Sequence, residues 1–197
     1  MGRVEGSSFL MLGGTSHPVC EALLRVQRER DPELGVHSRT VADLAAGVGR
    51  RLRLSATQLE ALILAGELHD VGKIALPDAI LEKPSPLDPD EWGLMQKHTL
   101  YGEEFLAASA ELSCAAKIVR ASHERYDGLG YPDGLTGETI PRAARIIAAC
   151  DAYVAMTDER PYARAASPDA AIAELRRCAS RQFDPVVVEA LCVELGA

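Results

Sequence analysis

The pair His69-Asp70 ends an apolar helical run, LEALILAGELHDVGK, and places two polar groups where the chain has to form its core. Residues three, four or seven positions apart share one face of a helix, and His69 follows Leu62 and Ala65 at that spacing. An imidazole and a carboxylate are costly to bury unless hydrogen bonds or a bound ion satisfy them. Any fold of this chain must therefore supply this pair with a partner.

Polar residues of the same kind recur on the apolar faces of four more predicted helices. They are His37, His98, His123 and Asp151. His98, for example, follows Trp92 and Met95 on one stripe. For a single histidine a hydrogen-bonded core position is the simpler interpretation, and we keep it for His17, which has no inward stripe. Taken jointly, buried imidazoles and carboxylates without metal would each need a paired partner, so the pattern predicts a metal site.

Length and composition favour one helical domain. The 197 residues are 47% hydrophobic and only 5% aromatic, so alanine, leucine, valine and isoleucine must build the core. The net charge of -8 argues against a general nucleic-acid surface, and no apolar run has the length of a membrane span. Five cysteines without a C-x-x-C pair are typical of a reducing compartment. We expect a cytoplasmic protein without a DNA, RNA or membrane partner.

Helix caps divide the chain into eight predicted helices. Good N-cap residues stand before a proline at Asp31, Asp88, Ser167 and Asp184. Ser55 and Asp88 also begin capping-box patterns. The expected helices are 18–30, 32–52, 56–70, 89–109, 112–125, 142–157, 168–180 and 185–195. Because no strand alternation stands out, we predict an all-α fold.

Residues 126–141, YDGLGYPDGLTGETIP, interrupt this helical pattern with four glycines and two prolines. A loop of this length inside a compact domain is usually functional or disordered. Five side chains give it apolar surface to pack: Tyr126, Leu129, Tyr131, Leu135 and Ile140. The loop begins shortly after His123 and ends shortly before Asp151. We therefore expect it to form a wall of the metal site.

Together these segments resemble the HD-GYP family, a subgroup of the HD superfamily of metal-dependent phosphohydrolases. The resemblance covers about residues 31–190 and rests on ELGVHSRTVA, HDVGKIALPDAIL, KHTLYG, SHERYDGLGYPDGLTGETIPRAARIIAACDAYVAMTDERPY and QFDP. It implies an HD-domain helical bundle with a long GYP loop beside the metal site. The expected organisation is an N-terminal extension over residues 1–30 and the HD-GYP domain over residues 31–197.

The resemblance also implies a centre of two or three divalent metals. By correspondence with the family's motifs, the ligands are Glu33, His37, His69, Asp70, His98, His123 and Asp151. Glu33 lies one turn before His37, which permits shared ligation. Asp70 resembles the family's bridging carboxylate. Imidazole and carboxylate ligands suit iron, manganese, nickel or zinc, and the family leans towards iron or manganese.

Members of this family hydrolyse cyclic di-GMP, which implies a metal-dependent phosphodiesterase that releases linear pGpG, GMP or both. His69, Asp70 and Lys73 are the expected catalytic residues, and a hydroxide between the metals is the expected nucleophile. Lys73, Tyr131 and Arg160 match family positions that contact the phosphates or guanine. Expected partners are cyclic di-GMP and, by the same resemblance, proteins with a GGDEF domain, while a homodimer stays open.

One position departs from the family pattern. Family members usually carry two histidines before the Glu-Arg of SHER, and here the first is Ser122. A serine hydroxyl is a poor ligand beside imidazole, so one metal loses an anchor. Three alternatives stay open: hydrolysis of another phosphoester, binding of cyclic di-GMP without cleavage, and action through protein contacts. The intact set of His37, His69, Asp70 and Asp151 favours hydrolysis.

Overall fold

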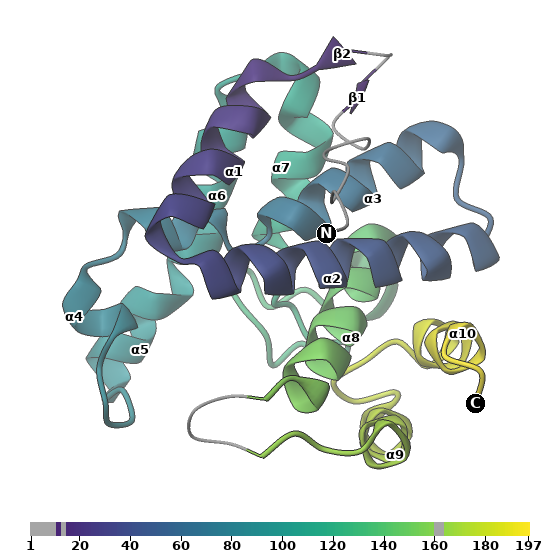
Figure 1. Cartoon of the computed structure of the whole chain (residues 1–197). Helices are drawn as coiled ribbons and strands as arrows, with labels where there is room; N and C mark the ends of the chain where they lie inside the picture. The colour runs from purple at the N-terminus through teal and green to yellow at the C-terminus, as the bar shows by residue number, and fades with distance from the viewer. Residues whose placement is uncertain (1–10, 13–14, 160–163) are drawn as a thin grey trace, which may run out of the picture.

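Helices make up most of the chain in the computed structural model, which describes residues 11–12, 15–159 and 164–197. The α-helices in these ranges are α1 Pro18–Arg30, α2 Pro32–Arg51, α3 Ala56–Leu68, α4 Asp78–Leu81, α5 Pro89–Gln96, α6 His98–Ala107, α7 Ser113–Arg120, α8 Arg142–Thr157, α9 Pro168–Cys178 and α10 Pro185–Glu194 (Figure 1). Short 3₁₀ helices are η1 Val71–Ala75, η2 Ala110–Leu112 and η3 Gly137–Thr139. The two-residue strands β1 Met11–Leu12 and β2 Thr15–Ser16 pair antiparallel. The all-α prediction is confirmed.

The predicted caps begin the helices as expected. Ser55 and Asp88 complete capping boxes with Gln58 and Glu91 at the starts of α3 and α5. The Asp31 carboxylate accepts a hydrogen bond from the Leu34 amide at the start of α2. These contacts satisfy amide groups that have no partner within the helix. Local sequence therefore determines where these helices begin.

Three of the predicted helices that carry candidate ligands end two or more residues earlier than the periodicity indicated. The prediction of one helix over 89–109 is wrong, because α5 ends at Gln96 and α6 begins at His98. The predicted helix 112–125 ends at Arg120, so His123 lies in the following turn and not on a helical face. The predicted helix 56–70 ends at Leu68, and His69 caps it. Apolar spacing continues past these ends because the turns that follow are also packed against the core.

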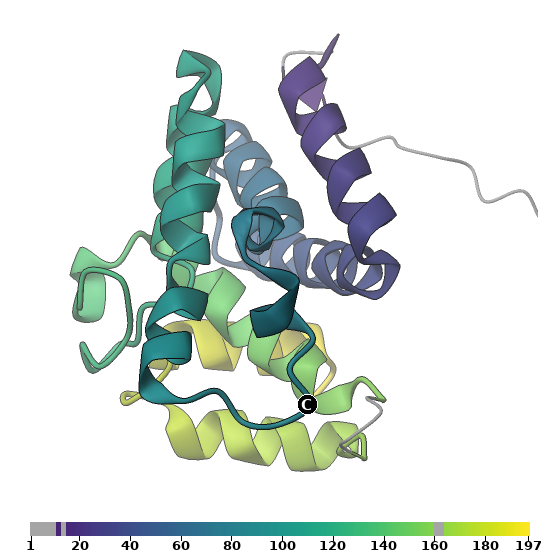
Figure 2. The same ribbon diagram turned by 90° about the vertical axis from the view of Figure 1, so that its left-hand side faces the viewer.

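The core lies where α2, α3, α7 and α8 meet. Helices α2 and α3 pack against each other, α6 pairs with α7, and α8 crosses α2 (Figures 1 and 2). Helix α1 contributes the buried Cys20 and Leu24 to this core, and the domain limit at residue 30 stays a prediction. Helices α9 and α10 cover α8. No helix in the described ranges is long and apolar enough to cross a membrane.

Gly72 allows η1 to lie directly against α6. A Cβ at Gly72 would lie 1.9 Å from the carbonyl oxygen of His98 and 2.6 Å from the amide nitrogen of Gly102. Both are backbone atoms and cannot move aside as a flexible side chain would. Asp70 lies two residues before this contact. The close approach therefore places Asp70 beside the helix that carries His98.

We predict that Gly72→Ala lowers the free energy of unfolding by about 3 kcal/mol, because the added methyl group overlaps the α6 backbone. Gly93, inside α5, is the matched control because a Cβ there meets no atom within 4 Å. Gly93→Ala should raise stability by up to about 1 kcal/mol through helix propensity. Equilibrium unfolding in urea measures both changes. A Gly72→Ala protein as stable as the wild type would contradict the close packing.

Candidate metal centre

Six of the seven predicted ligands come together in two groups of three. The first triad is His37, His69 and Asp151, and the second triad is Asp70, His98 and His123. Within each triad the ligand atoms lie within 4.8 Å of one another. The residues come from α2, the end of α3, the start of α6, the turn after α7, and α8. The fold thus gathers side chains that lie more than one hundred positions apart in the sequence.

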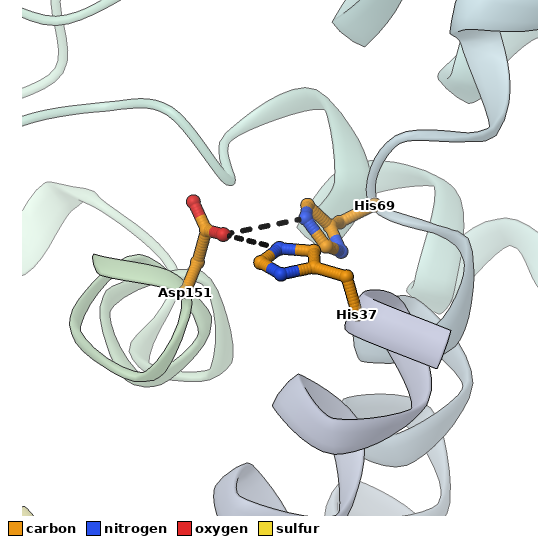
Figure 3. Close-up of side chains that lie close together, drawn as sticks. All are labelled: His37, His69 and Asp151. Carbon is orange, nitrogen blue, oxygen red and sulfur yellow. Dashed lines mark hydrogen bonds and ion pairs between the residues drawn. The ribbon is translucent and has the colours of Figure 1, made fainter. Parts of the chain in front are cut away.

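In the first triad both imidazoles point at one carboxylate oxygen (Figure 3). Oδ1 of Asp151 lies 2.8 Å from Nε2 of His37 and 3.9 Å from Nε2 of His69. Burial opposes protonation of His37, but the hydrogen bond and charge of Asp151 raise the pKa of this imidazole above its usual value. Burial favours the neutral form of Asp151, yet the His37 hydrogen bond holds its pKa below the usual value. The Asp151 carboxylate is therefore ionised near neutral pH.

In the second triad, the Asp70 carboxylate lies near the two imidazoles of that triad and near His69 of the first triad. Oδ1 of Asp70 lies 3.3 Å from Nε2 of His98 and 3.8 Å from Nε2 of His123. Oδ2 lies 2.7 Å from Nζ of Lys73 and 3.5 Å from Nε2 of His69. Burial disfavours the charged form, but Lys73 and the imidazoles hold the pKa of Asp70 well below its usual value. The buried Asp70 carboxylate thus lies close to imidazoles of both triads.

The backbone orients two of the imidazoles. Nδ1 of His69 contacts the carbonyl oxygen of Gly66, and Nδ1 of His98 contacts that of Met95, each at 2.8 Å. A carbonyl oxygen only accepts hydrogen bonds, so the proton is on Nδ1 and the lone pair is on Nε2. Burial lowers the pKa of His98 to about 4, which keeps this ring neutral. Both rings therefore present the nitrogen that a metal requires.

Buried polar atoms without a hydrogen-bond partner concentrate at this site. Among the described residues these atoms include Nε2 of His69, His98 and His123, and Oδ1 of Asp70. Each such atom costs about 1–3 kcal/mol when nothing satisfies it. Divalent cations would satisfy all four. Neutral imidazoles and carboxylates without a thiolate suit first-row transition metals, so these residues fit a metal centre.

Glu33, the seventh predicted ligand, belongs to neither triad. Glu33 is exposed in the first turn of α2 and lines a cavity of about 560 Å³ together with Lys73 and Met95. Its role as a metal ligand stays a prediction. Arg160 lies outside the described residues, and its role rests on the sequence alone.

The loop over residues 126–141 forms a wall of the site, as predicted. The ring of Tyr131 stacks on His123 with the centroids 5.2 Å apart and the planes at 11°. The buried Glu124 carboxylate accepts hydrogen bonds from the amides of Asp133 at 2.7 Å and Leu135 at 3.1 Å. Burial, together with the charges of nearby carboxylates, raises the pKa of Tyr131. Its hydroxyl therefore stays protonated and can donate a hydrogen bond.

Two other loop residues show how the chain turns there. A Cβ at Gly130 would lie 2.3 Å from the amide nitrogen of Arg125, so the turn requires glycine. Leu129 is 77% exposed, and the expectation that it packs was wrong. The tight turn brings Gly130 close to the backbone of Glu124 and Arg125 and leaves the neighbouring leucine exposed.

Ser122 is buried beside the site, and its hydroxyl donates to the carbonyl oxygen of Val119 at 2.8 Å. Three further residues at the site were missed by the sequence reasoning: Trp92, Glu124 and Asp158. The Asp158 carboxylate lies 3.5 Å from Nδ1 of His37 and follows Asp151 by two helical turns, a spacing that could have revealed it. Burial of a lone glutamate such as Glu124 leaves no periodic signal.

Known proteins share this architecture. Residues 19–187 match the HD domain family. The chain is 42% identical over 171 residues to the cyclic di-GMP phosphodiesterase response regulator RpfG of Xanthomonas campestris pv. campestris, a match that covers 86% of this chain and 45% of that protein. It is 36% identical over 179 residues to the 3'3'-cGAMP-specific phosphodiesterase 2 of Vibrio cholerae, over 90% of this chain and 34% of that protein. The chain thus spans less than half the length of these curated relatives.

A solved structure gives the same fold. The cyclic GMP-AMP specific phosphodiesterase V-cGAP3 of V. cholerae matches 90% of this chain and 47% of its own length, with a TM-score of 0.68 and 18% sequence identity. At that identity the likeness shows a common fold and leaves the chemistry to be argued from the side chains.

We predict that the purified protein carries at least one first-row transition metal per chain. The double variant His69→Ala/Asp70→Ala should lose most of it, because it removes ligands from both triads. Inductively coupled plasma mass spectrometry measures the metal content. His17→Ala is the matched control, since His17 directly precedes α1 and belongs to neither triad. A folded, metal-free wild type would rule out the metal centre.

Restoring the histidine that the family usually carries tests the effect of the serine at position 122. Ser122→His adds an imidazole next to His123, so the variant should bind more metal per chain and release it more slowly to a mild chelator. Unchanged metal content in a folded variant would show that position 122 does not reach the metals.

Proposed function

Because the chain belongs to the HD domain family, as its HD-GYP motifs predict, we propose that it is a metal-dependent phosphodiesterase that hydrolyses cyclic di-GMP. The observation that carries this proposal is the pair of triads around the ionised Asp70, in which four of the ligand atoms are buried without a hydrogen-bond partner. The names of the relatives support a cyclic dinucleotide as the substrate class. Linear pGpG, GMP or both are the proposed products.

Each triad would hold one divalent metal, with iron or manganese favoured by the resemblance. His37, His69 and Asp151 would hold one, and the second triad, centred on Asp70, would hold the other. When bound, such metals supply a Lewis acid and lower the pKa of a water molecule. The Asp70 carboxylate would serve the second position, and its Oδ2 lies 3.5 Å from Nε2 of His69 in the first triad. The hydrogen bonds on Nδ1 of His69 and on Nδ1 of His98 keep these rings oriented.

Three further residues complete the proposed substrate site. The Lys73 ammonium contacts Asp70 through one of its three N–H donors, so it can also donate to a phosphate oxygen and offset the charge that develops there. Tyr131 can donate a hydrogen bond through its protonated hydroxyl. Arg160 is proposed from the sequence to bind a phosphate through its planar guanidinium group.

Hydrolysis of 3'3'-cGAMP is the second candidate, because one of the relatives is named for that activity. Cyclic di-GMP is preferred because the relative of higher identity is named for it. Contact with GGDEF-domain proteins is a further part of the proposal and rests on the resemblance alone. A cytoplasmic location is proposed from the five cysteines without a C-x-x-C pair, and a homodimer stays open.

Turnover assays test the function directly. Protein loaded in parallel with iron, manganese or zinc should convert cyclic di-GMP to pGpG or GMP, as followed by chromatography, faster than it converts 3'3'-cGAMP. Asp70→Asn should lower kcat by about 100-fold or more, since it removes the charge that both triads share. Tight binding of cyclic di-GMP without turnover in every metal state would establish the receptor alternative instead.

Arg160→Ala should distinguish a dinucleotide enzyme from a general phosphodiesterase. Loss of a charge-assisted hydrogen bond to phosphate costs about 1.5–3 kcal/mol, so kcat/KM for cyclic di-GMP should fall by about 10- to 100-fold. Bis(4-nitrophenyl) phosphate has only the phosphate that reacts, and its hydrolysis should change little. Arg25→Ala, on the exposed face of α1, is the control. Equal losses on both substrates would favour the broader phosphohydrolase alternative.

A further inference from the structure

Trp92 is the only tryptophan of the chain and lies on α5 with 48% of its surface exposed. The apolar stripe Trp92, Met95, His98 predicts an inward position, but α5 ends before His98, and none of the α5 residues is buried. A large aromatic ring that remains half exposed beside a polar site suits a binding surface better than a core.

An aromatic row connects Trp92 to the metal ligands. The ring of Trp92 lies 6.2 Å from that of Tyr131, nearly perpendicular at 82°. Tyr131 in turn stacks on His123 at 5.2 Å and meets the edge of His98 at 6.2 Å. The row therefore runs from the second triad to an exposed indole. A ligand bound at the second triad would contact Tyr131 first and Trp92 next.

The arrangement suits Tyr131 and Trp92 to different contacts with a ligand. The imidazole of His123 covers one face of Tyr131, so this ring is partly occupied before any ligand arrives. Nearby carboxylates and burial keep its hydroxyl protonated, which suits hydrogen bonding to phosphate. The indole of Trp92 is not covered by an imidazole in this way, and it is a larger ring than that of Tyr131. Stacking on a nucleobase is therefore better suited to Trp92 than to Tyr131.

We propose that Trp92 stacks on one nucleobase of the cyclic dinucleotide while a phosphate of the same molecule lies at the metal centre. The inference rests on the proposed function and adds a specificity-determining residue to it. A cyclic dinucleotide has a base beside each phosphate, whereas simple phosphodiesters have none. Because every base has a π face, Trp92 selects for nucleotides over base-free phosphodiesters, and not for guanine over adenine.

Tryptophan fluorescence reads this contact directly, because the signal of the wild type comes from Trp92 alone. The metal-loaded wild type is titrated with a phosphorothioate analogue of cyclic di-GMP, which resists hydrolysis. Stacking should quench the emission by at least about half at saturation. Inorganic phosphate, which has no base, should leave the emission unchanged. Equal quenching by phosphate, or calorimetric binding of the analogue without quenching, would overturn the assignment of Trp92.

Two variants at the same position separate stacking from packing. Trp92→Leu keeps an apolar side chain but removes the ring, and should raise KM for cyclic di-GMP about tenfold or more with little change in kcat. Trp92→Phe keeps a ring and should restore KM to within about threefold of the wild type. Hydrolysis of methyl 4-nitrophenyl phosphate, which is too small to span the aromatic row, should be the same in all three proteins.

The outcomes distinguish failure of this inference from failure of the proposed function. If Trp92→Leu turns over cyclic di-GMP with unchanged KM, the stacking role fails while the phosphodiesterase stands. If Trp92→Leu loses activity on both substrates equally, its role is structural and the inference fails. If the wild type neither binds nor cleaves cyclic di-GMP, the proposed function fails, and the stacking role fails with it.

Discussion

The site depends on keeping one ionised carboxylate, Asp70, inside a helical core. Burial raises the pKa of this group, and its charge is retained chiefly because the Lys73 ammonium lies 2.7 Å from Oδ2. The chain reaches that geometry by ending α3 just before His69 and by packing η1 closely on α6 at Gly72. A methyl group at position 72 would separate the carboxylate from His98. A backbone constraint therefore determines the electrostatics of the site.

The segment that follows Asp70 is also held from outside the predicted domain. The guanidinium of Arg30, at the end of α1, donates to the carbonyl oxygens of Ile74 and Leu76 and pairs with Asp78. These carbonyls lie at the end of η1 and just beyond it, where a short helix has no further amides to satisfy them. Helix α1 thus supports Lys73 through the backbone of η1. The N-terminal helix is part of what shapes the site.

The sequence predicted which side chains come together better than it predicted the elements that carry them. Caps such as those at Ser55 and Asp88 are local, so the starts of these helices were correct. The break between α5 and α6 depends in part on a contact distant in sequence, because the His98 carbonyl lies against Gly72. The His98 imidazole adds a local contact with the Met95 carbonyl. Apolar periodicity indicates which residues are buried, but a turn packed against the core gives the same sequence pattern as a helix face. His123 is half-buried at the site in this way, although no helix carries it.

The electrostatics of the site imply an order of binding. The ionised Asp70 and Asp151 repel a phosphodiester, and the Lys73 charge is paired with Asp70. The two divalent cations of the proposed function would outweigh these two carboxylates and reverse the sign of the local field, in a chain whose net charge is -8. Phosphate binding should therefore require prior metal binding. Stacking on Trp92 involves no charge, so the part of the affinity that comes from the base should persist when the metals are removed.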